Sequence, residues 1–167
     1  MTLKSYFFLL ITSSLISLQC GTSQTATKAL SAKESSVKKL LESRQYRFVP
    51  QSVQAQGGRS RQITNYSLEV RGDTLISYLP YYGVAYSAPV GITEGPLDFK
   101  ATNITYTSEE GSNGNNLINI KPGDARTDAQ EFFLSVSSTG YTNLSVRFNN
   151  RQSISFYGEV RPLRARR

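Results

Sequence analysis

The sequence predicts a mainly β protein, an antiparallel sandwich or open barrel of about seven to nine strands with one N-terminal helix. Several short segments alternate between apolar and polar residues, and turns rich in Gly, Asn and Pro separate them. The aromatic residues are ten Tyr and eight Phe, with no Trp, a composition that suits a half-buried sheet. The 167 residues are enough for one domain with one core, expected at residues 31–160.

One segment has helical spacing. Val37, Leu40 and Leu41 recur at helical intervals and form one apolar stripe. Ser31 and Glu34 have the spacing of a capping box, which predicts that the helix begins after Ser31. We expect this helix to cover an edge or an open end of the sheet.

The alternation of apolar and polar residues that is typical of β-strands begins directly after the predicted helix. Residues 46–53 alternate, and Pro50 among them favours an edge strand because proline cannot donate to a ladder. A hairpin follows at residues 66–79, where Gly72 and Asp73 separate two alternating segments. A two-residue loop with Gly first predicts a type II′ turn.

The second half of the chain repeats the strand pattern without another helix. Residues 97–101 and 104–106 alternate with opposite parity, which predicts a β-bulge near Thr102 and Asn103. A polar loop is expected at residues 109–116. Further strands are expected at residues 117–120, 131–136, 141–148 and 153–160.

The N-terminus has the features of a lipoprotein export signal at residues 1–19. Lys4 precedes an apolar segment, residues 6–18, that is too short to span a bilayer comfortably. The residues around Cys20 resemble a lipobox, the site where a signal peptide is cut before a lipid-modified Cys. We expect Cys20, the only Cys, to attach the chain to a membrane, and residues 20–30 to form a flexible tether.

These features predict an outer membrane lipoprotein that faces the periplasm, since no acidic export segment follows Cys20. The net charge is +7, and residues 161–167 form a basic C-terminal tail. This tail is either solvated or in contact with anionic lipid headgroups. Nucleic acid is not an expected partner of an exported chain.

The composition excludes several kinds of catalytic and metal site. The chain has no His, so it cannot form a Ser-His-Asp triad or a His metal ligand. A lone Cys excludes an internal disulfide and a thiolate cage. The acidic residues at 124–131 lack the spacing of an EF-hand calcium site. Glu94 and Asp98 do not by themselves indicate the pair of catalytic carboxylates of a glycosidase. We expect no enzyme activity, no metal and no cofactor.

Residues 78–86 form the least ordinary segment, with Pro80 and Gly83 among crowded tyrosines. One interpretation is a structural corner whose rings pack over a sheet end. The other is a surface for a glycan or an envelope protein, because Tyr offers a large rigid contact area with a polar tip. The candidate surface residues are Tyr78, Pro80, Tyr81, Tyr82 and Tyr86.

Three segments in order resemble one known family. They are Tyr-Leu-Pro-Tyr-Tyr-Gly-Val-Ala-Tyr at 78–86, Gly-Pro-Leu-Asp-Phe at 95–99, and Arg-Gln-Ser-Ile-Ser-Phe-Tyr-Gly at 151–158. Together they resemble the DUF4251 family of uncharacterised Bacteroidetes lipoproteins, over residues 34–160. The resemblance implies an envelope location and a mostly β domain, and it implies no activity. In the same group of bacteria, Asp-Thr-Leu resembles an O-glycosylation acceptor, which makes Thr74 a candidate site.

Two functions therefore stay open. The first is an envelope-anchored, non-catalytic binding or interaction module that uses the aromatic segment or one sheet face. The second is a small-ligand carrier with an apolar cavity inside an open β-barrel. An enclosed apolar cavity would favour the carrier, and a filled interior would favour the module.

Overall fold

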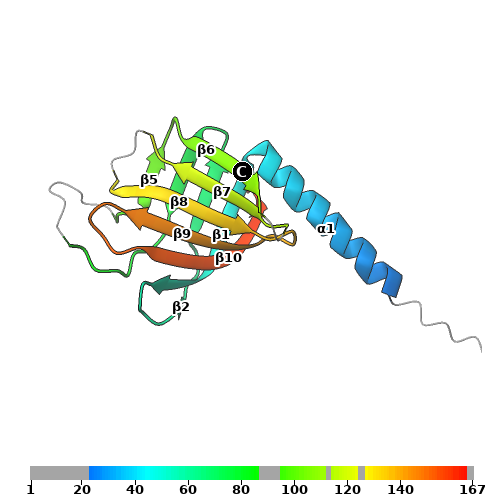
Figure 1. The fold of residues 1–167 in the computed structure, drawn as a ribbon, viewed down its shortest axis with the longest axis horizontal. Helices are drawn as coiled ribbons and strands as arrows, with labels where there is room; N and C mark the ends of the chain where they lie inside the picture. The colour runs from blue at the N-terminus through cyan, green and yellow to red at the C-terminus, as the bar shows by residue number, and fades with distance from the viewer. Residues whose placement is uncertain (1–22, 87–94, 112–113, 124–126, 165–167) are drawn as a thin grey trace, which may run out of the picture.

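The computed structural model describes residues 23–86, 95–111, 114–123 and 127–164. Its elements are α1 (Ser23–Ser43), β1 (Gln45–Ala55), β2 (Arg61–Gln62), β3 (Ser67–Arg71), β4 (Thr74–Tyr78), β5 (Asp98–Ala101), β6 (Thr105–Glu110), β7 (Asn116–Lys121), β8 (Ala129–Val136), β9 (Tyr141–Phe148) and β10 (Ile154–Pro162). The strands form one antiparallel sheet in the order β5-β4-β3-β1-β10-β9-β8-β7-β6, and β2 pairs with β1 (Figure 1). The predicted mainly β class with one N-terminal helix is confirmed.

The sheet curls into a half-barrel. Tyr46 of β1 and Tyr106 of β6 are five strands apart along the sheet, yet their hydroxyl oxygens lie 3.3 Å apart. Phe99 of β5 and Phe132 of β8 also meet, edge to face, with ring centroids 5.9 Å apart. Of the two predicted arrangements, the open barrel is therefore the one observed.

Inward-facing side chains fill the interior of the half-barrel. Buried residues alternate with more exposed ones along β1, β8, β9 and β10, as expected for strands with one face on the core. These strands and α1 contribute to a single hydrophobic cluster. The largest fully buried side chains are Tyr46, Phe48, Phe132 and Phe156.

Helix α1 packs against one open end of the half-barrel, as expected. Val37 and Leu41 are each only 5% exposed, and Ser138 in the β8–β9 hairpin donates a 3.0 Å hydrogen bond to Glu34. The predicted N-cap at Ser31 is wrong, because the helix already begins at Ser23. Five of the seven residues between these two positions are Ala, Gln, Lys or Leu, which favour helix, so part of the expected tether is helical. Figure 1 shows this N-terminal part extending away from the sheet.

The prediction that Pro50 marks an edge strand is wrong, because β1 lies between β3 and β10. Pairing with β3 reaches only Phe48, and pairing with β2 begins only at Ser52. The register with β10 shifts between Pro50 and Ser52, which forms a bulge. Pro50 thus lies beside a bulge and between two short pairings, where a residue without N–H is tolerated.

The predicted type II′ hairpin is confirmed. Arg71 pairs with Thr74, so Gly72 and Asp73 form the two-residue loop. Gly72 has a φ of 62°, and Asp73 is not among the residues with positive φ, as a type II′ turn requires.

The predicted bulge at Thr102 and Asn103 is wrong. These residues connect β5 to β6, which lie at opposite edges of the sheet, and Asn103 turns the chain with a φ of 56°. The change in the alternation of apolar residues therefore marks the point where the chain crosses from one edge of the sheet to the other. Two boundaries also move: β6 extends to Glu110 into the expected loop, and β10 extends to Pro162, so Arg161 is part of a strand.

The bulge in β1 requires glycine on the facing strand. A Cβ atom at Gly158 would collide with the Val49 carbonyl oxygen and lie 2.7 Å from the Pro50 Cα atom. We expect Gly158→Ala to lower the free energy of unfolding by about 2 kcal/mol, measured by urea denaturation. The control is Gly95→Ala, where the nearest atom lies 4.0 Å from the added Cβ. Equal stability of the two variants would contradict this account of the bulge.

Candidate functional site

Tyr81 fixes the aromatic segment to the half-barrel. Its ring packs edge to face on Phe148 at the end of β9, with centroids 5.1 Å apart. Its hydroxyl shares its one proton between the backbone carbonyl oxygens of Val84 and Gln152, at 3.1 and 2.9 Å. Burial raises the pKa of Tyr81, so the phenol stays protonated and can donate. This residue matches the structural-corner interpretation.

Backbone hydrogen bonds extend this attachment along the segment. The Gln152 N–H donates to the Val84 carbonyl at 3.0 Å, and the Tyr86 N–H donates to the Asn150 carbonyl at 2.9 Å. Ala85 and Arg151 form an antiparallel bridge between these two bonds. Residues 84–86 therefore run beside the connection from β9 to β10 and are held to it by one isolated β-bridge.

An ion pair lies beside the Tyr81 ring. Arg151 Nε lies 2.7 Å from Asp128 Oδ2, and the two side chains are only 14% and 9% exposed. The Arg151 guanidinium also lies over the Tyr81 ring, 5.5 Å from its centroid. Asp128 thus serves this ion pair, which the sequence did not reveal because its members are 23 residues apart.

The other acidic candidates are dispersed. Glu131 forms a 2.7 Å ion pair with Arg147 and accepts a hydrogen bond from Asn119, and this hydrogen bond and the nearby cations lower the pKa of Glu131. Asp98 is exposed on β5. Asp124 and Glu94 lie outside the described residues. Among the residues that the structure describes, no three Asp, Glu, Cys or His side chains gather in a way that could hold a metal ion.

Several tyrosines beside Tyr81 are exposed. Tyr78, Tyr82 and Tyr86 are 51%, 46% and 72% exposed. Tyr66, which the sequence did not single out, lies with its ring centroid 5.3 Å from that of Tyr78. Arg61 lies over the Tyr82 ring, 5.5 Å from its centroid. We call Tyr66, Tyr78, Tyr82 and Arg61 the tyrosine patch.

The Tyr66 phenol of the patch stays protonated. Partial burial raises the pKa of Tyr66, and the neighbouring Tyr82 and Tyr78 hydroxyls raise it further. The remaining candidate, Pro80, is half-buried in the turn next to the buried Leu79 and does not belong to the patch. The five predicted residues thus divide into a corner (Tyr81 with Pro80), two members of the patch, and Tyr86 farther along.

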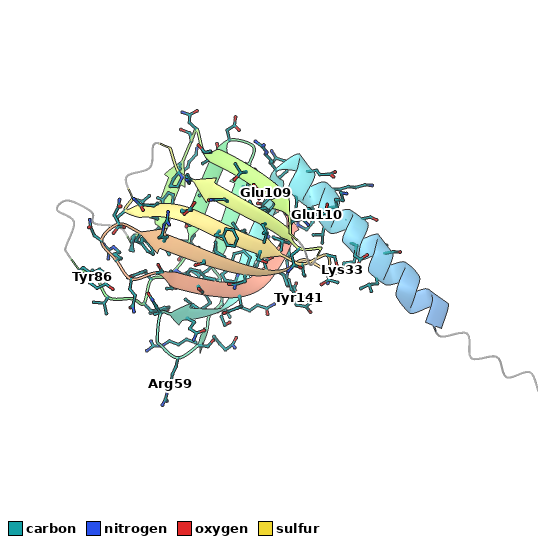
Figure 2. The ribbon with its side chains drawn as sticks, in the orientation of Figure 1. Lys33, Arg59, Tyr86, Glu109, Glu110 and Tyr141 are labelled. Atoms are coloured by element: carbon teal, nitrogen blue, oxygen red, sulfur yellow. The ribbon has the colours of Figure 1, made fainter. Side chains whose placement is uncertain are left out.

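The patch and α1 lie at different ends of the half-barrel. Strand β1 begins after α1 at Gln45, which pairs with Arg71, whereas Tyr78 pairs with Ser67 at the other end of the β3–β4 hairpin. Figure 2 shows Tyr86 on the side of the sheet remote from α1 and from Lys33.

The remaining sequence candidates lie elsewhere. Thr74 is half-buried at the first position of β4, beside the turn of the β3–β4 hairpin. Cys20 lies outside the described residues. Within the part of the chain that the structure describes, no helix combines the length and the apolar character needed to cross a membrane.

Comparison with known proteins identifies the family. The family model described as "Domain of unknown function (DUF4251)" matches residues 28–160. The chain belongs to the DUF4251 family. The sequence resemblance is thereby confirmed, and the family description supplies no activity.

One solved relative shares the fold of this DUF4251 chain. It is a DUF4251 family protein from Bacteroides eggerthii, with a TM-score of 0.59 and 14% sequence identity. The match covers 81% of this chain and 91% of that chain. At this identity the similarity shows a common fold. A search of curated proteins finds no match.

The Tyr81 hydroxyl can be tested by removing one oxygen atom. We expect Tyr81→Phe to lower the free energy of unfolding by about 1 to 2 kcal/mol, because two carbonyl oxygens lose their donor. Urea denaturation measures the change. The control is Tyr86→Phe, at a side chain that is 72% exposed, and it should leave stability unchanged. A Tyr81→Phe variant as stable as this control would show that the hydroxyl does not hold the segment.

Proposed function

We propose that this DUF4251 protein is an envelope-anchored, non-catalytic interaction module that binds a partner protein through the tyrosine patch. The single observation that carries the proposal is the exposure of Tyr78 and Tyr82 beside Arg61, on a segment that Tyr81 fixes to the half-barrel. Tyr and Arg are the residue types that most often dominate binding energy at protein interfaces. A surface that is already ordered also loses little conformational entropy on binding.

The proposed anchor is a lipid on Cys20, in the outer membrane and facing the periplasm. Cys20 lies three residues before Ser23, where α1 begins. A helix of 21 residues is about 30 Å long. Since the patch lies at the other end of the half-barrel, the anchored protein presents the patch away from the bilayer.

Basic residues support this orientation. Arg161 and Arg164 are exposed, and Figure 1 shows the C-terminal end of β10 on the same side as α1. Positive charge there faces the bilayer in the proposed orientation, where anionic headgroups attract it. The charge is partly offset, because Arg161 forms a 3.3 Å ion pair with Glu159.

A small-ligand carrier is less well supported. Tyr46, Phe48, Phe132 and Phe156 are fully buried and occupy the space in which a carrier would hold its ligand. An apolar ligand of ordinary size needs a cavity of at least about 300 Å³. The interior packing therefore favours the interaction module.

The patch can be tested by photo-crosslinking in the source organism. Benzoylphenylalanine at position 82 of the full chain should give a discrete adduct, because this position lies within the patch. Replacing both Tyr78 and Arg61 with Ala should reduce the adduct at least about tenfold, as expected for loss of central contacts. The control is the same probe at position 133, where Phe133 is 42% exposed on β8. Equal adducts at both positions, or none at position 82, would contradict the proposed partner surface.

The anchor and the proposed glycan on Thr74 can be tested by intact mass. We expect the membrane fraction to contain a chain that begins at Cys20 with added acyl groups and a glycan. Thr74→Ala should remove the glycan mass alone. Cys20→Ser should remove the acyl mass, because serine provides no thioether. A wild-type chain that keeps residues 1–19 without acyl groups would contradict the anchor, and an unmodified Thr74 would contradict the glycan.

A further inference from the structure

A shallow groove of about 410 Å³ lies on the outer face of the sheet, over β1, β2, β8, β9 and β10. Its centre is a row of side chains that pair across five strands. Ser52 of β1 pairs with Gln62 of β2 and with Tyr157 of β10. The row continues from Tyr157 to Asn143 of β9 and from there to Ser135 of β8. Neighbouring strands are about 4.8 Å apart, so this row spans about 19 Å.

The groove is uncharged. Most of its lining residues carry a hydroxyl or a carboxamide group, although apolar atoms make up the larger part of its exposed surface, and none of the described lining residues carries a charge. Ion pairs border it on both sides, Arg161 with Glu159 toward α1 and Arg147 with Glu131 toward the other end of the sheet. A neutral band between charged rows indicates a ligand without charge.

The polar side chains of the row are available to a ligand. Within the described residues, no hydrogen bond occupies the side chains of Ser52, Gln62, Ser135 or Asn143, or the hydroxyl of Tyr157. Carboxamides and hydroxyls both donate and accept hydrogen bonds. Asn119, on the same face but outside the groove, is instead bound to Glu131.

Two aromatic rings complete the groove. Tyr157, 44% exposed, lies between Ser52 and Asn143 in the row. Tyr141, 58% exposed, lies toward α1, where Lys33 Nζ is 5.3 Å from the ring centroid. Figure 2 shows Tyr141 and Lys33 near the end of the sheet at which α1 packs. The groove thus combines flat apolar surfaces with hydrogen-bonding groups.

We propose that this groove binds a neutral oligosaccharide. A sugar ring presents C–H groups on its faces, which match the Tyr157 ring, and hydroxyls on its edges, which match Ser52 and Asn143. An anionic ligand would need a cation, which the described lining lacks, and a lipid or apolar peptide would leave the hydroxyls and carboxamides of the row without hydrogen-bond partners. The length of the row accommodates several sugar units. The groove shares no residue with the tyrosine patch, so it is a second surface that does not depend on the proposed protein partner.

Biolayer interferometry with immobilised oligosaccharides tests the groove. The analyte is the purified full chain in a detergent without a sugar headgroup, and the probes are cellohexaose, maltohexaose, chitohexaose and, as the acidic comparison, hexagalacturonate. We expect saturable binding to at least one neutral hexamer and none to hexagalacturonate. Tyr157→Ala and Asn143→Ala should each weaken this binding at least about tenfold, which corresponds to about 1.4 kcal/mol.

Phe133→Ala provides the matched control, because Phe133 is 42% exposed on the same outer face and does not line the groove. It should leave binding unchanged. Ser135→Glu places a charge in the groove without truncating an aromatic ring, and it should also abolish binding. This variant tests the groove even if Tyr157→Ala does not fold. Thermal unfolding establishes the folding of every variant.

The proposal is overturned if no neutral hexamer binds, if hexagalacturonate binds equally well, or if folded groove variants bind like the wild type. Loss of oligosaccharide binding in Tyr82→Ala, with the groove variants unaffected, would move the glycan to the tyrosine patch and also overturn it. The crosslink at position 82 should persist in Asn143→Ala. The two surfaces therefore succeed or fail in separate measurements.

Discussion

A single antiparallel sheet with one helix beside it can bury an apolar face only by curling onto itself. The curl brings Tyr46 of β1 to Tyr106 of β6 and Phe99 of β5 to Phe132 of β8, contacts that a flat sheet would not allow. Because inward side chains then fill one interior, the outward side chains of the central strands form one outer face. Two open ends and one long outer face result, and the functional candidates lie on these surfaces.

The two ends of the half-barrel are closed by different means. At one end, Val37 and Leu41 of α1 are buried in the core, and the rest of the helix extends outward. At the other end, the Tyr81 ring packs on Phe148 and its hydroxyl binds backbone carbonyls, so a loop closes the end without a helix. This closure leaves neighbouring tyrosines exposed on an ordered segment. The short segment 78–86 thus contains one tyrosine that packs inward and others that face outward.

Local pattern predicted local structure well. The strand at residues 141–148 and the turn at Gly72 follow from alternation and from a glycine at positive φ, which neighbours along the chain determine. The prediction of an edge strand from Pro50 was wrong because the position of a strand in the sheet depends on strand order, which residues 46–53 do not encode. The Arg151–Asp128 pair and the groove could not be predicted for a related reason, because each depends on contacts between different segments, such as Ser52 of β1 beside Tyr157 of β10. Tyr66, in contrast, lies beside Tyr78 in the hairpin that the sequence predicts.

The positions of the two proposed surfaces relative to α1 determine how an anchored chain can use them. The groove reaches Tyr141, which Lys33 of α1 contacts, so it lies beside the helix, whereas the tyrosine patch lies at the opposite end. The proposed lipid on Cys20 would place the groove nearer the bilayer and the patch farther from it. The surfaces share no residue, and they adjoin on β2, where Gln62 of the groove directly follows Arg61 of the patch. The curl of one sheet thereby gives one small chain two separate candidate binding surfaces.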